Sequence, residues 1–293
     1  MSTFNMNRLL FIRSIFNYSL KSSQFDVMDI KTFSTKQKGE MVEIGSQRIN
    51  YMKVGTGKTN VLCFPGALGT IWSDFKPQIE GLDRSKFTIV AWDPPGHGYS
   101  RPPERLLTSK FYEEDADTAH ALMRFLGIKS FSLLGWSDGG ISGLILAAKY
   151  PEVVDKLIVW GSNSFVMPTE VEGYEKLRNI KNWSEKARAP LIELYGEKTL
   201  QDIQNSWVDA MQEINQKGGN ICKSILKDIR CPTLILHGDK DPLVDPEHPK
   251  YLLENIKGSK IHRFTEGKHN IHLRYAKEFN NIVTNFLLNS EGI

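Results

Sequence analysis

Short apolar runs alternate with amphipathic, helix-like segments along most of this chain. The alternation begins with a predicted hairpin, in which residues 42–44 and 48–54 flank a turn at Gly45-Ser46-Gln47. Further strand-like runs are predicted at residues 60–64, 87–92, 130–134, 156–160, 233–237 and 259–264. Helical patterns separate most of these runs, notably at residues 112–126, 139–150, 246–256 and 273–288. Near-continuous apolar strands between helices predict an α/β fold with a mostly parallel central sheet and helices on both faces.

The interval between residues 160 and 231 interrupts this alternation. It is rich in helix formers and contains Trp183, Tyr195 and Trp207. So long a connection in a compact fold must carry structure of its own. We therefore predict a helical cap at 162–229, placed over the carboxyl ends of the strands of a core formed by 40–161 and 230–290. A helical insertion remote from the functional site is the alternative.

The first 39 residues have a different composition. Arg8, Arg13 and Lys21 precede the first acidic residue, Asp26, among serines, asparagines and bulky apolar residues. The pattern favours a mitochondrial presequence, and a short basic tail on a cytosolic protein is the alternative.

Composition excludes several classes of protein. The net charge of the 293 residues is +3, which those three N-terminal cations account for, so nothing indicates a nucleic-acid-binding surface. No apolar run reaches the roughly 18 residues that span a bilayer. Three scattered cysteines (Cys63, Cys222 and Cys231) argue against a disulfide framework and a zinc site.

The most informative segment is Gly135-Trp136-Ser137-Asp138-Gly139, which lies between a strand-like run and an alanine-rich helical pattern. Gly-x-Ser-x-Gly in this context is typical of the nucleophile elbow of α/β-hydrolases. The turn is so tight that its serine is strained and its flanking residues must be small. Ser137 is therefore the predicted nucleophile, and an ordinary glycine-rich turn is the alternative.

A serine hydroxyl needs a base, and the base needs an orienting acid. The ends of two later strands supply both in the order typical of this fold, with Asp239 and Asp241 before His269. We predict Asp241 as the acid, because Gly-x-x-Asp-x-x-Val is the common pattern, although Asp239 could replace it. A metal site at His269 and His272 is a weak alternative, since no third ligand is patterned nearby and histidines so spaced usually lie on a solvated surface.

The strand that ends at Phe64-Pro65-Gly66-Ala67 predicts an oxyanion hole made by the backbone amides of Ala67 and Asp138. Asp138 itself is unusual, because a carboxylate beside the nucleophile disfavours negative charge on the substrate oxygen. An ammonium group on the substrate would offset this charge. Alternatively, Asp138 caps the helix that follows. The residues alone support both alternatives equally.

Taken together, these segments resemble the valacyclovir hydrolase, or biphenyl hydrolase-like, family over about residues 41–288. The resemblance implies a serine hydrolase of α-amino acid esters, located in mitochondria, that uses no metal or cofactor. It also implies that Ser137 is the nucleophile, Asp241 the acid and His269 the base, and that Asp138 binds the substrate's α-amino group. We expect a monomer that acts on a small amino acid ester and binds neither nucleic acid nor a membrane.

One departure and two alternatives accompany this resemblance. Where the family has Asp-x-Arg-Gly, this chain has Asp93-Pro94-Pro95-Gly96, and a proline cannot make the hydrogen bonds of an arginine. Carbon–carbon bond hydrolases of the meta-cleavage type share the fold and triad, but they usually have Trp after the histidine, where this chain has Asn270. A catalytically silent hydrolase-fold binding protein is the other alternative, and the presence of all three triad candidates argues against it.

Overall fold

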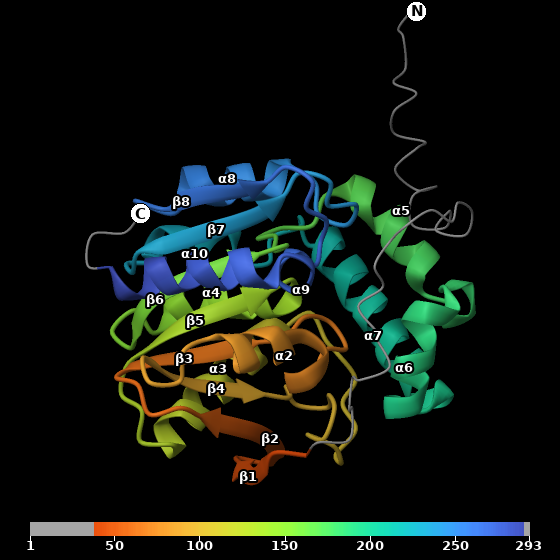
Figure 1. Cartoon of the computed structure of the whole chain (residues 1–293). Coiled ribbons are helices and arrows are strands. Elements are labelled where there is room, and N and C mark those ends of the chain that lie inside the picture. The colour runs from red at the N-terminus through yellow and green to blue at the C-terminus, as the bar shows by residue number, and fades with distance from the viewer. Residues whose placement is uncertain (1–37, 290–293) are drawn as a thin grey trace, which may run out of the picture.

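The computed structural model describes residues 38–289 and is built around an eight-stranded sheet (Figure 1). The strands, which lie in the order β1-β2-β4-β3-β5-β6-β7-β8, are β1 (Glu40–Ile44), β2 (Gln47–Val54), β3 (Thr59–Phe64), β4 (Phe87–Trp92), β5 (Phe131–Trp136), β6 (Val154–Trp160), β7 (Thr233–Gly238) and β8 (Lys260–Phe264). The hairpin of β1 and β2 is antiparallel, as is the pairing of β2 with β4, and all other pairs are parallel. The predicted mostly parallel α/β fold is confirmed.

Helices cover both faces of the sheet, and this explains why its central strands are continuously apolar. One face is covered by α2 (Ile71–Gly81), α9 (Ile271–Arg274) and α10 (Ala276–Leu288), and the other by α3 (Phe111–Phe125), α4 (Asp138–Lys149) and α8 (Glu247–Asn255). Side chains alternate between the faces along each strand. In β3, Val61 and Cys63 join the core beneath α2 and α10, whereas Leu62 joins the core beneath α3 and α4.

The segment between β6 and β7 forms a separate group of helices. These are α5 (Pro168–Leu177), η2 (Ile180–Asn182), α6 (Glu185–Tyr195), α7 (Glu197–Gln216) and η3 (Lys223–Asp228). In α7 the residues Leu200, Ile203, Met211 and Ile214 recur at helical spacing and are buried, so this helix presents one apolar stripe to its neighbours. In Figure 1, α5, α6 and α7 stand together beside one end of the strands, and we call these three helices the cap.

The predicted presequence falls outside the described residues, apart from its last two positions. None of the helices within residues 38–289 is both long enough and apolar enough to cross a bilayer.

Candidate active site

Ser137 occupies the tight turn between β5 and α4. Its backbone has φ 54° and ψ −123°, a region that a residue with a side chain rarely adopts. A Cβ atom added to Gly135 would lie 2.6 Å from the Cα of Gly140, and one added to Gly139 would lie 2.3 Å from the carbonyl oxygen of Phe64. Both positions therefore require glycine, and the geometry is that of the elbow that the sequence predicts.

The imidazole of His269 lies within hydrogen-bonding distance of both Ser137 and Asp241. Nε2 of His269 is 3.1 Å from Oγ of Ser137, and Nδ1 of the same ring is 2.8 Å from Oδ2 of Asp241. The other oxygen of Asp241 accepts hydrogen bonds from the amides of Leu243 and Val244. Burial raises the pKa of Asp241, but His269 and these amides outweigh burial and hold the pKa below its ordinary value. Asp241 is therefore a carboxylate that can orient the imidazole.

Asp239 and His272, the alternatives for the acid and for a metal ligand, have other partners in the structure. The carboxylate of Asp239 forms an ion pair with Arg263 at 2.7 Å instead of contacting His269. His272 is fully buried, and its Nδ1 accepts a hydrogen bond from the indole of Trp160 at 2.9 Å. The expectation of a solvated surface histidine is wrong here, because α9 packs this side chain against the rings of Trp160, Phe75 and Phe279. Within residues 38–289, no three His, Cys, Asp or Glu side chains are arranged to hold a metal ion.

The loop after β3 passes directly beside the serine. A Cβ atom on Gly66 would lie 3.3 Å from the Cβ of Ser137. Neither the amide of Ala67 nor that of Asp138 donates a hydrogen bond to another described residue. Two unused N–H donors next to the serine are what an oxyanion hole requires.

The carboxylate of Asp138 turns toward the cap and α3. Its Oδ1 accepts a hydrogen bond from the hydroxyl of Tyr112 at 3.0 Å, and its Oδ2 accepts one from Nε1 of Trp207 at 2.8 Å. Burial raises the pKa of Asp138 to about 6, although the two hydrogen bonds oppose this rise. Asp138 is therefore largely ionised at neutral pH, and its side chain does not turn aside to cap α4. No motif in the sequence marks Tyr112 or Trp207 as partners of Asp138.

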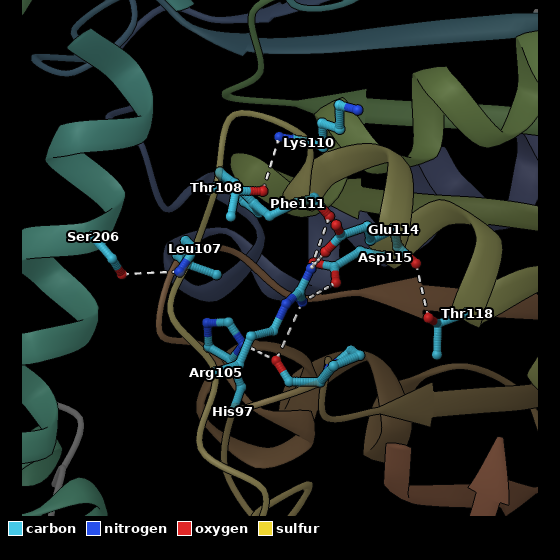
Figure 2. Close-up of polar contacts among 11 residues, drawn as sticks. His97, Arg105, Leu107, Thr108, Lys110, Phe111, Glu114, Asp115, Thr118 and Ser206 are labelled. Carbon is cyan, nitrogen blue, oxygen red and sulfur yellow. Dashed lines mark hydrogen bonds and ion pairs between the residues drawn. The ribbon is translucent and has the colours of Figure 1, made fainter. Parts of the chain in front are cut away.

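Pro95 stands where the resembling family has arginine. A cation from elsewhere in the chain, Arg105, lies beside it. Nη1 of Arg105 donates to the carbonyl of Pro95 at 3.3 Å and forms an ion pair with Asp115, and Nη2 pairs with Glu114 at 2.8 Å (Figure 2). The ring of His97 also contacts the Pro95 carbonyl, and burial lowers the pKa of this histidine to about 4. The turn therefore keeps a guanidinium group, supplied from the loop before α3.

Comparison with known proteins identifies the family of this chain. Residues 59–191 match the α/β-hydrolase fold family. A mouse protein named serine hydrolase BPHL is 47% identical over 88% of this chain and 89% of its own length. A Pseudomonas sp. protein named 2-hydroxy-6-oxononadienedioate/2-hydroxy-6-oxononatrienedioate hydrolase is 27% identical over 83% of this chain and 92% of its own length.

A solved meta-cleavage product hydrolase from Pseudomonas fluorescens IP01 has the same fold. It superimposes with a TM-score of 0.68 at 20% identity, over 85% of this chain and 97% of its own. Because the identity to the mouse serine hydrolase is high over nearly the full length of both proteins, the chain belongs to the biphenyl hydrolase-like serine hydrolases of the α/β-hydrolase fold.

Proposed function

We propose that this serine hydrolase cleaves esters of small α-amino acids, with Ser137, His269 and Asp241 as its catalytic triad. One observation carries the choice of substrate. Asp138 follows the nucleophile directly and is held by Tyr112 and Trp207 as a partly buried carboxylate. An isolated negative charge here would oppose the oxyanion that forms during acyl transfer. A substrate ammonium group removes this conflict by pairing with Asp138.

In the first half of the proposed reaction, Nε2 of His269 takes the proton of Ser137 while Oγ attacks the ester carbonyl carbon. Asp241, 2.8 Å from Nδ1, stabilises the imidazolium that forms. The carbonyl oxygen becomes an oxyanion between the amides of Ala67 and Asp138. Each such donor lowers the barrier by about 3–4 kcal/mol.

In the second half, His269 passes its proton to the departing alcohol, which leaves Ser137 acylated. Water then attacks the acyl-enzyme, with His269 as the base that takes its proton. The second tetrahedral intermediate breaks down to free the amino acid and restore the serine hydroxyl. These steps are carried by side chains and backbone amides of this chain.

Carbon–carbon bond hydrolysis is the second candidate, because the name of the Pseudomonas sp. relative gives that protein a dicarboxylate substrate. Asp138 opposes it here. A carboxylate beside the nucleophile repels a dianion and attracts an ammonium group. The amino acid ester activity therefore fits the charge of this site better.

Reaction with a fluorophosphonate tests the proposed nucleophile. We expect covalent labelling of the wild type at Ser137, and neither labelling nor ester hydrolysis by folded Ser137→Ala. A wild type that does not react would indicate a silent binding protein. Ester hydrolysis that survives Ser137→Ala would place the nucleophile elsewhere.

We also propose that the basic N-terminal segment directs the protein to mitochondria. The support is compositional, namely three cations and no acid in the first 25 residues. A fluorescent protein fused behind residues 1–40 is expected to enter mitochondria, and a diffuse cytosolic signal would reject this proposal.

A further inference from the structure

The loop that follows β3 contains a strained residue immediately after the proposed oxyanion donor. Leu68 has φ 60°, and within residues 38–289 only Leu68 and Ser137 have positive φ without being glycine. Such a conformation costs about 1–3 kcal/mol and persists only where the surroundings impose it. The hydrogen bonds of this loop identify the groups that hold Leu68 in this conformation.

The first contact comes from the cap. Tyr195, the last residue of α6, is buried, with 5% of its surface exposed. Its hydroxyl donates to the carbonyl of Leu68 at 2.9 Å and accepts the amide N–H of Gly98 at 3.0 Å. The guanidinium of Arg101 lies 4.5 Å from the centre of the tyrosine ring and donates to the carbonyl of Leu194, which fixes this end of α6 against the core.

The second contact comes from the core. Asp74 of α2 is buried, with 4% of its surface exposed, and its Oδ2 accepts the amide N–H of Gly66 at 2.9 Å. The hydroxyl of Ser73 donates to the other oxygen at 2.6 Å. Gly69 closes the turn by donating to the carbonyl of Gly66 at 3.0 Å. Ala67 is therefore fixed on one side through Gly66 and on the other through Leu68.

We propose that Tyr195 and Asp74 are positioning residues that hold the Ala67 amide in the oxyanion hole, so that the cap supports the chemical step itself. This inference rests on the proposed role of Ala67. Oxyanion stabilisation requires donors that are already in place, and a displacement of about 1 Å can slow catalysis about 100-fold. Without the tyrosine hydroxyl, Leu68 can relax toward negative φ, which turns the neighbouring peptide planes away from the serine.

Kinetics of Tyr195→Phe on p-nitrophenyl acetate test this proposal, because this neutral ester has no ammonium group to pair with the Asp138 carboxylate. We expect kcat to fall about tenfold, with KM within about twofold of the wild type. Inhibition by a small alkyl boronic acid, which forms a tetrahedral adduct on serine, should weaken about tenfold as well. Tyr150→Phe is the matched control, because this tyrosine's hydroxyl bonds to Asp117 at the surface, and it should change neither value.

Two results for Tyr195→Phe would overturn the proposal: an unchanged kcat, or a raised KM with unchanged kcat and boronate affinity. The second result would assign Tyr195 to substrate access. If Tyr195→Phe does not fold, two variants of Asp74 test the proposal instead. Asp74→Ala should lose about tenfold in kcat, and Asp74→Asn should stay within about threefold, because its amide oxygen can still accept from Gly66. Wild-type kcat in Asp74→Ala would reject the proposal, whereas activity in Ser137→Ala would reject the nucleophile instead.

Discussion

The indole N–H of Trp207 donates to Oδ2 of Asp138 at 2.8 Å and thereby joins cap helix α7 to the residue that follows the nucleophile. The hydroxyl of Tyr112 holds the other oxygen of the same carboxylate from α3. The orientation of Asp138 consequently depends on the cap being docked. Under the proposed function, recognition of the substrate amine therefore depends on α7 as well as on Asp138.

Replacing Asp138 by alanine should affect only substrates that carry an ammonium group. For a valyl ester, we expect kcat/KM to fall about 100-fold, because a partly buried charge pair is lost. For a neutral ester of similar size, we expect no loss and a gain of at most about threefold, because the backbone amide at this position remains and the charge that opposes the oxyanion is removed. Asp239→Ala, which removes a carboxylate paired with Arg263, is the control and should leave both rates unchanged. Equal losses on both esters would refute an ammonium-binding role.

Trp207→Phe should also lower the preference for the valyl ester, but by less than Asp138→Ala does. The phenyl ring fills most of the space but cannot donate to Asp138, so we expect about a tenfold fall in the ratio of kcat/KM for the valyl ester to that for the neutral ester. Trp183→Phe, between η2 and α6, is a matched control, because the indole of Trp183 donates to the carbonyl of Leu177 instead. A ratio that is unchanged in Trp207→Phe would show that Asp138 is oriented without the cap.

The selectivity for amino acid esters should depend on pH through Asp138. Since burial raises the pKa of this carboxyl to about 6, lowering the pH through 6 adds a proton and removes the charge proposed to bind the ammonium group. The ratio of kcat/KM for the valyl ester to that for the neutral ester should therefore rise between about pH 5 and pH 7. It should fall again near pH 8, where a free α-amino group (pKa about 7.7–8.0) loses its proton. Asp138→Asn should abolish the rise at low pH, and a rise that persists in this variant would assign it to another group.

Stability should also depend on pH through Asp74. Burial raises the pKa of this carboxyl from 3.8 to about 7, so between these values the folded state holds a proton that the unfolded state releases. Its contribution to stability therefore falls as the pH rises through this window. We expect Asp74→Asn to raise the free energy of unfolding by about 2 kcal/mol more at about pH 8 than at about pH 5. Urea denaturation at both pH values measures this difference, with Asp239→Asn as the surface control. The same increment at both pH values would show that Asp74 is charged throughout.

The sequence could predict the sheet and the meeting of Ser137, Asp241 and His269 for one physical reason. Parallel strands end at the same edge, so residues that follow β5, β7 and β8 must lie near one another however far apart they are in the chain. The elbow was recognisable because its glycines are dictated by contacts within a few residues and with one neighbouring strand.

The surroundings of Asp138 and Leu68 could not be predicted in this way. Tyr112, Tyr195 and Trp207 reach them from helices whose docking depends on packing, and such packing leaves no fixed spacing in the sequence. His272 was misjudged for a related reason. Its spacing from His269 matches one turn of an exposed helix, but the burial of α9 against Trp160 is decided by tertiary contacts.

If Asp138 selects substrates with a free α-amino group, the wild-type protein should distinguish a valyl ester from the matching N-acetylvalyl ester by kcat/KM. Acetylation removes the positive charge and leaves the ester bond in place. We expect a preference of about 100-fold for the free amine. Equal kcat/KM values for the two esters would contradict it.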